Sequence, residues 1–467
     1  MIGSAIICFF SLVNGFETVT KEMDLVKLQN SLLESEKYVK NHVGYEDSAI
    51  FISNSGAVSS ALINYIIGNK LKVVKVPPFN KMTITKADNQ SGPEINNDES
   101  FLKIANPKKW TSKEFPNLTL WDVPDFYNDI VEMKDIIRAF SVCQLVKNVK
   151  SLKIILVFDI KDIVEDNTFE FQSFLKAVEE LFANKFKQYF SSISVIFTNV
   201  PNMVNEIPVS YEYINYYLNN LLQNEIQWSE ISKDFLQYLV NNNDRIALFK
   251  EPSREGILIN NDIDVNIFRV IKNSESIQKS SLQDVHPPIS AHSILGLHEA
   301  QKELFPKSTF DDIKNILQKK FQKISTNVEK ITTSAERNET IGFLEYLMRI
   351  RGILHSSDYE GDIYSKTNIV ASIDNDIRNI FERHGLFGKI ELIMFMEKLL
   401  DTEISKTLED NIDDIIVSSE TEVNRTITFL IKKLSESPIE KKNTNSWEMV
   451  TNFLLDLYTS FTHIYKQ

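Results

Sequence analysis

Glycine is scarce in this chain: it accounts for only 13 of the 467 residues, whereas average usage is about 7%. Loops that wrap closely around a bound nucleotide need glycine, because its backbone readily adopts conformations that let peptide N–H groups approach a phosphate. The low glycine content therefore predicts a helix-rich protein with few tight loops, and it argues against a close-fitting nucleotide loop.

Cysteine is scarcer still, with Cys8 and Cys143 as its two occurrences. Cys8 lies in a segment that resembles a removable leader, so the mature chain would keep Cys143 alone and could form no intrachain disulfide. Cys143 shares the helical apolar pattern of residues 130–147. We therefore expect a buried, unreactive thiol.

A basic excess is also absent, since 64 acidic residues against 51 basic ones give a net charge of -13. This charge opposes phosphate backbones and anionic lipid, and no basic patch in the sequence offsets it. The composition argues against nucleic acid as a partner and gives little support to membrane binding.

The N-terminus contains an uncharged apolar run, whereas no other stretch approaches the 18 or so apolar residues that span a bilayer. Residues 1–15 have the length of a signal-peptide core and end with Val13 and Gly15, where a signal peptidase requires small or modest side chains. We interpret them as a secretory signal and the mature protein as extracellular. The alternative is a buried N-terminal strand or helix in a cytoplasmic protein.

Residues 16–275 have the pattern of an α/β domain, because apolar strands alternate with helices between residue 48 and about residue 250. Most of the strands are continuous apolar runs, which predicts a mostly parallel sheet with helices on both faces. The polar, Pro- and Asn-rich residues 77–100 are expected to form a long mobile loop. Strands are expected at 48–52, 71–76, 118–122, 153–159, 194–198 and 245–249, and helices at 24–42, 59–67, 128–148, 168–188 and 209–242.

A change in composition at 276–293 predicts a linker, and every periodic segment in 294–467 is helical. Apolar residues spaced by three and four from Phe310 to Ala335 predict one helix of about seven turns. Further stripes run at 369–385, 389–401, 408–434 and 447–465. We expect an all-α bundle, whose stripes form an internal core or, alternatively, a seam between two copies.

Residues 48–68 have the outline of a phosphate-binding loop: a buried strand, a loop of small residues and an apolar helix. A working loop reads Gly-x-x-x-x-Gly-Lys-Ser/Thr. In register, Ser53 and Val58 replace the two glycines, and Ser59 replaces the lysine that meets the phosphate charge. Gly56 still permits a tight turn, and Ser60 keeps the hydroxyl that could bind magnesium.

A second segment, residues 120–129, resembles the Asp-x-Pro-Gly-Phe-x-x-Asp segment that ends the third strand of septin-, dynamin- and immunity-associated GTPases. Asp122 and Pro124 match that pattern. Asp125 replaces the glycine, and its carboxylate would repel a γ-phosphate.

A third segment, residues 194–201, resembles the strand ending in Thr/Asn-Lys-x-Asp that selects guanine in these GTPases. Thr198 is kept. Asn199 stands for the lysine and Pro201 for the specificity aspartate, so guanine recognition is expected to be lost or rebuilt.

Together the three segments resemble a degenerate P-loop GTPase with a helical C-terminal extension. The resemblance implies a P-loop NTPase-like fold and a vestigial nucleotide site at Ser53, Gly56, Ser59, Ser60, Asp122, Thr198 and Asn199, in which Ser60 and Asp122 would hold magnesium. The replaced lysine and aspartate favour a catalytically inactive scaffold that needs no cofactor and binds a protein partner or itself through its C-terminal helices. The alternative is a cytoplasmic GTPase or ATPase that binds Mg-GTP with a lysine from elsewhere, such as Lys81 or Lys86.

The histidines at 286, 292 and 298, followed by Glu299 and Glu303, invite a metal-site interpretation. Their spacing of six residues differs from the three to five that zinc ligands on one helix favour, and no cysteine joins them. We therefore expect linker and helix-end histidines with no metal.

Overall fold

The computed structural model describes residues 23–53, 56–76, 81–95, 106–124, 132–165, 168–223, 228–258, 263–355 and 361–437. The secretory signal expected at 1–15 and the helix expected at 447–465 lie outside these ranges. The chain divides into two compact units, one comprising residues up to Gln301 with Met394–Ile404, and the other Lys302–Ile393 with the residues from Ser405 onward.

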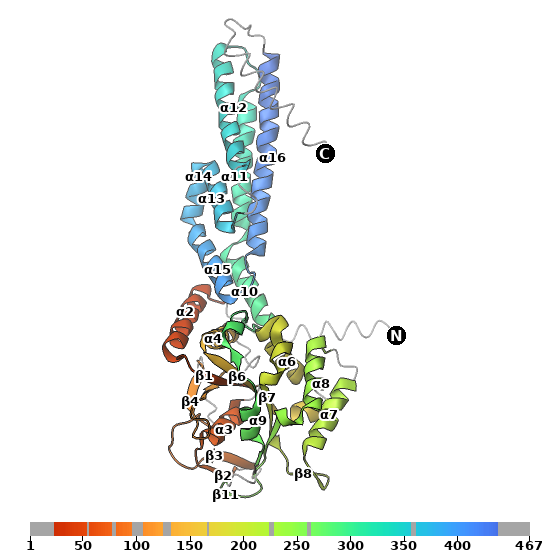
Figure 1. Cartoon of the computed structure of the whole chain (residues 1–467). Helices are drawn as coiled ribbons and strands as arrows, with labels where there is room; N and C mark the ends of the chain where they lie inside the picture. The colour runs from red at the N-terminus through yellow and green to blue at the C-terminus, as the bar shows by residue number, and fades with distance from the viewer. Residues whose placement is uncertain are drawn as a thin grey trace. The chain divides into compact units, whose positions relative to one another are not determined.

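The first unit is built on a mostly parallel sheet (Figure 1). Its strands follow the order β12 (Asp264–Val265), β10 (Ile246–Lys250), β7 (Ile193–Val200), β6 (Ser151–Asp159), β1 (Asp47–Ser53), β5 (Thr119–Asp122) and β4 (Lys108–Thr111), with β13 (Ile277–Gln278) added to β6. The five inner strands are parallel, and β4, β12 and β13 run antiparallel to their neighbours.

Helices cover both faces of this sheet because alternate strand residues point to opposite sides. Ala49 and Phe51 of β1 belong to one buried cluster, and Ile50 and Ile52 belong to the other. The first cluster includes α3 (Gly56–Ile67) and α9 (Ile267–Asn273), and the second includes α4 (Glu132–Asn148), α6 (Phe169–Phe182), the 3-10 helix η2 (Ala183–Ser192), α7 (Tyr211–Gln223) and α8 (Glu230–Asn241). The expected α/β class is thus confirmed.

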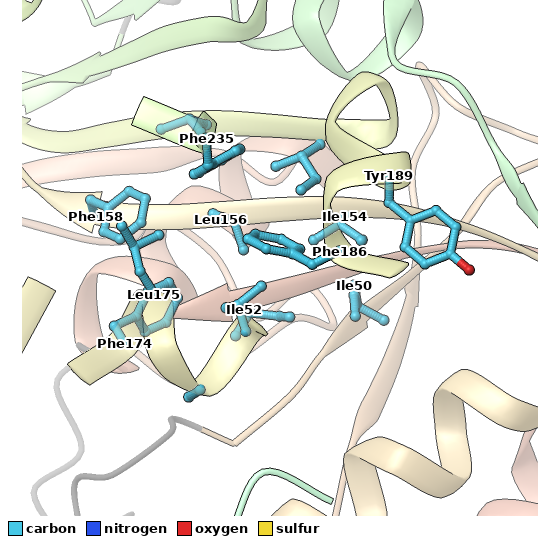
Figure 2. Close-up of a cluster of buried hydrophobic side chains, with 14 of the residues drawn as sticks. Ile50, Ile52, Ile154, Leu156, Phe158, Phe174, Leu175, Phe186, Tyr189 and Phe235 are labelled. Atoms are coloured by element: carbon cyan, nitrogen blue, oxygen red, sulfur yellow. The ribbon is translucent and has the colours of Figure 1, made fainter. Parts of the chain in front are cut away.

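The second cluster is the larger of the two and is rich in phenylalanine. Figure 2 shows part of it, with Ile154 and Leu156 of β6 beside Phe186 of η2. This unit also contains the helix α2 (Leu25–His42) and the short elements α5 (Lys161–Val164), η3 (Asn243–Arg245), η5 (Lys279–Ser281), β8 (Met203–Val204) and β9 (Ile207–Pro208).

One expected strand lies outside the main sheet. β2 (Leu71–Val76) pairs antiparallel with β3 (Lys81–Lys86) and with β11 (Gly256–Ile257) in a separate sheet. The physical reason is visible in its Leu-Lys-Val start, where buried and exposed side chains alternate, as in a strand with one wet face.

The expectation of one long mobile loop at 77–100 is also wrong for its described part. Lys81–Lys86 form β3, and the segment near Pro93 is bound to α3. The side chain of Asn64, fully buried in α3, donates hydrogen bonds to the carbonyls of Ser60 (2.8 Å) and Pro93 (2.7 Å).

Three expected helices are shorter than their apolar patterns. The helix expected at 168–188 gives way to the 3-10 helix η2 after Phe182, and the one expected at 209–242 is divided into α7 and α8. The helix expected through Ala335 ends at Asn327 as α11 (Lys307–Asn327), and α12 (Ser334–His355) follows.

A capping box begins α12. The backbone N–H of Glu336 donates to Thr333 Oγ1 (3.2 Å), and the Glu336 carboxylate accepts from the backbone N–H of Thr333 (3.0 Å). This reciprocal pair is a helix start signal. Val328 and Ile331 in the connection are still buried, which explains why the apolar stripe continues across the break.

The second unit is all-helical, as expected. Its long helix α16 (Lys406–Glu436) packs along α11, α12 and α13 (Ile363–Ile373) (Figure 1). The other helices after the sheet are α10 (Ala291–Leu304), α14 (Asn375–Arg383) and α15 (Leu386–Leu400), and α15 is divided between the two units. Among the described residues, no helix is long and apolar enough to cross a membrane.

Candidate functional site

The segments that resemble GTPase motifs end their strands at one edge of the main sheet. Ser53 ends β1 and Asp122 ends β5, where Asp122 pairs with Phe51. Thr198 lies on β7 opposite Asp159, the last residue of β6. Strands β5 and β6, which both follow β1 in the chain, pair with β1 on its two opposite sides. In open α/β sheets, ligands bind outside the carboxyl ends of the strands at such a switch point.

Helix α3 begins at this edge with Gly56, its first residue. A helix N-terminus presents free N–H groups and a positive dipole end, which suits an anion. Ser59 is 1% exposed, and its Oγ has no hydrogen-bond partner among the described residues. Ser60 is half-buried, so its side chain keeps some exposure to solvent at this edge of the sheet.

In residues 194–201, the segment that resembles a guanine-selecting motif, two side chains form hydrogen bonds within the protein. Thr198 is buried and donates its hydroxyl to the Phe158 carbonyl (2.9 Å). Asn199 donates its side-chain amide to Asp159 Oδ2 (2.6 Å), and Asp159 Oδ1 accepts from the backbone N–H of Lys161 (3.0 Å). The side chains of Thr198, Asn199 and Asp159 are therefore all engaged in hydrogen bonds within this unit.

The backbone of Asn199 supports this arrangement. Its φ is +52°, in the left-handed region that asparagine tolerates better than most side chains. Sequence reasoning missed Asp159, although its position at the end of a buried apolar strand was a usable signal.

Lys86 is misplaced for the role of a substitute phosphate lysine. It pairs with Leu71, just beyond the C-terminal end of α3, and Ala87 donates to the Lys70 carbonyl (2.8 Å). The helix is about 18 Å long at 1.5 Å per residue, so Lys86 lies near the end opposite to Ser59 and Ser60. Asp125 and the side chain of Lys81 lie outside the description.

The histidines of the linker region lie apart in separate pairs. His286 Nδ1 contacts the Asp401 carboxylate, and His292 Nε2 is 3.3 Å from Glu132 Oε1. Within the described ranges, no group of three or more His, Cys, Asp or Glu side chains is placed to hold a metal ion.

Cys143 is buried as expected, with 1% exposure, and its Sγ donates to the Val285 carbonyl at 3.4 Å. Burial raises the pKa of this thiol to about 12, so thiolate is absent at neutral pH. In a Cys8→Ser chain, we expect no reaction with Ellman's reagent in the folded state and one equivalent after denaturation in guanidinium. Rapid labelling of the folded chain would show that the thiol is accessible.

No protein-family description matches this chain, and no curated protein matches it. Among solved structures, the chain is similar to a mutant of S. thermophilus NFeoB bound to GDP, with 10% identity, coverage of 82% of this chain and 99% of that chain, and a TM-score of 0.23. A score this low carries no argument about the fold or the site, so the interpretation of this edge of the sheet rests on its own strand order and contacts.

Proposed function

We propose that this protein is a non-catalytic, GTPase-like scaffold that acts by binding protein partners. In this proposal the α/β unit is a structural platform, and the helices of the second unit bind another protein or a second copy of the chain. The proposal includes secretion: residues 1–15 would act as a secretory signal, and the mature protein would lie outside the cell, where there is little GTP to turn over.

The hydrogen bonds of Asn199 and Thr198 carry this proposal. A guanine ring would have to compete for an amide that already donates to Asp159 at 2.6 Å and for a hydroxyl that donates to Phe158 at 2.9 Å. Breaking a bond to a charged acceptor costs about 1.5–3 kcal/mol. The replaced lysine at Ser59 removes the attraction for phosphate that would repay this cost.

A second candidate is a nucleotide site with an unorthodox loop. The buried hydroxyl of Ser59, which has no partner among the described residues, favours it. An unsatisfied buried hydroxyl costs about 1–3 kcal/mol, and a ligand oxygen at the start of α3 would satisfy it. Ser60 and Asp122 would then be the residues that hold Mg-GTP.

Thermal unfolding with millimolar GTP, GDP or ATP and magnesium distinguishes the two candidates. We expect no change in Tm, because in the scaffold proposal the groups that would contact the base are already hydrogen-bonded within the protein. A ligand present at 100 times its Kd would add about 2.7 kcal/mol of stability, which raises Tm by several degrees in a unit of this size.

A Ser60→Ala variant and a Ser418→Ala control make the result specific. Ser418 lies on α16, and its hydroxyl donates to the nearby Ile415 carbonyl (3.1 Å). A GTP-dependent rise in Tm that disappears in Ser60→Ala and persists in Ser418→Ala would overturn the scaffold proposal in favour of the second candidate.

A further inference from the structure

A cleft of about 760 Å³ lies within the second unit, between α11, α12 and the junction of α13 with α14. We call it the basic cleft, after Lys320, Lys323 and Arg349, which line it. Its size is in the range of small-molecule sites. It lies in a different unit from the edge of the sheet described above.

Helical spacing brings the cationic side chains into the basic cleft. Lys320, Lys323 and Ile324 recur at three and four residues, so they share one face of α11. Phe343, Tyr346 and Arg349 follow one another at intervals of three residues, so they lie along one side of α12. The cleft therefore has three cations among its polar lining residues and apolar side chains such as Ile324 and Phe343 along its walls.

One carboxylate lines the basic cleft. Asp374 forms an ion pair with Lys320, and the side chain of Asp374 is only 11% exposed. Its Oδ1 also accepts from the backbone N–H of Asp376 at the start of α14 (2.8 Å). Within the described ranges, Lys323 and Arg349 form no ion pair, so the cleft keeps an excess of two positive charges in a chain whose net charge is -13.

Two of these cations, Lys320 and Arg349, lie close to the ring of Tyr346. Lys320 Nζ lies 5.8 Å from the ring centroid, and Arg349 Cζ lies 5.6 Å from it. Both distances are within cation–π range. The Tyr346 hydroxyl is buried and has no hydrogen-bond partner among the described residues. Two like charges held beside one ring repel each other, and a bound anion would relieve that repulsion.

We propose that the basic cleft binds a small soluble phosphate monoester. A monoester carries a charge of about -1.5 to -2 at neutral pH, which matches the excess charge of the cleft, whereas a carboxylate carries half as much. Arg349 offers a planar fork that binds two phosphate oxygens, and Lys323 adds a point charge. The organic part of the ligand contacts Phe343 and Ile324.

Titration of the full chain with phenyl phosphate tests the site, with isothermal calorimetry as the readout. We expect saturable binding that weakens at least roughly tenfold in both Lys323→Ala and Arg349→Ala, because each removes a charge-assisted contact. Both side chains are exposed, so these variants should fold, and their melting curves check this. Benzyl alcohol, which has the ring without the phosphate, should not bind.

Lys319→Ala is the matched control, since Lys319 is an exposed α11 lysine that does not line the cleft. No binding of phenyl phosphate at millimolar concentration would overturn the proposal, and so would an equal loss of affinity in Lys319→Ala. Binding of vesicles that contain phosphatidic acid, without binding of phenyl phosphate, would also overturn it and indicate a lipid headgroup.

Nucleotides carry phosphates too, so the two sites must be separated. A rise in Tm with nucleotide that survives Ser60→Ala and disappears in Arg349→Ala belongs to the basic cleft. Such a result supports this inference, and it does not contradict the proposal that the nucleotide site at the strand ends has been lost.

Discussion

Replacing Phe158 with alanine is expected to lower the free energy of unfolding of the α/β unit by about 4 kcal/mol. Phe158 is fully buried on β6 and meets Phe171 (4.7 Å between ring centroids) and Phe174 (5.0 Å) edge to face. Figure 2 shows Phe158 beside Phe174 and Leu175. The deletion removes the transfer energy of the ring and leaves a cavity lined by other rings that are held in place.

Chemical denaturation followed by tryptophan fluorescence and far-UV circular dichroism measures this loss. Phe158→Leu should cost less, about 1.5 kcal/mol, since it keeps most of the buried volume. Phe169→Ala is the surface control, because Phe169 is 70% exposed, and it should stay within about 0.5 kcal/mol of wild type. A Phe158→Ala variant as stable as Phe169→Ala would show that this aromatic cluster is not packed as described.

Neutralising the two carboxylates around Lys366 is expected to destabilise the helical unit by about 3 kcal/mol. The side chain of Lys366 is 7% exposed, and its Nζ lies 2.7 Å from Glu409 Oε1 and 3.0 Å from Asp413. Burial lowers the pKa of Lys366, but the hydrogen bonds from these two carboxylates outweigh it and raise the pKa overall. Glu409→Gln with Asp413→Asn leaves a buried ammonium without a counter-charge.

Adding Lys366→Met to the double variant should restore most of the lost stability, because the buried charge is then gone as well. Hydrogen exchange of the α13 and α16 amides reports on this unit apart from the sheet. If the triple variant is no more stable than the double one, the loss comes from packing and not from an unpaired buried charge.

The pH dependence of the same network has a defined sign. The folded-state pKa of Lys366 is raised, so its contribution is complete below the unfolded pKa of about 10.4 and is lost as the pH rises through the folded value. The wild-type helical unit should therefore lose more stability than the triple variant as the pH rises above about 10.4.

Local signals in the sequence located the inner strands of the main sheet and most of the longer helices, but they did not always predict where a helix ends. The residues Thr-Ser-Ala-Glu at 333–336 are a capping-box signature, and they could have placed the start of α12 at Ser334. The unbroken apolar stripe outweighed that signal, because Val328 and Ile331 remain buried although they are not helical. An apolar period reports burial and so cannot by itself report where a helix ends.

The candidate site could likewise be predicted from the sequence only in part. The order of the segments around Ser53, Asp122 and Thr198 placed their residues at strand ends, because continuous apolar runs define parallel strands and their carboxyl ends share an edge. The hydrogen bond between Asn199 and Asp159 could not be predicted from the sequence. It joins residues 40 positions apart, and no local pattern specifies which polar groups at an edge will pair.

By itself, the sequence determined the α/β class of the first unit, the helical character of the second and the burial of Cys143, because these depend on apolar spacing that any packed chain must satisfy. Only the tertiary structure decided that β2 and β3 leave the main sheet, that Lys86 lies far from the start of α3, and that Lys320 and Arg349 meet at one ring. These features depend on which elements pack together, and that choice is made by the whole chain, since many pairings satisfy the same local pattern.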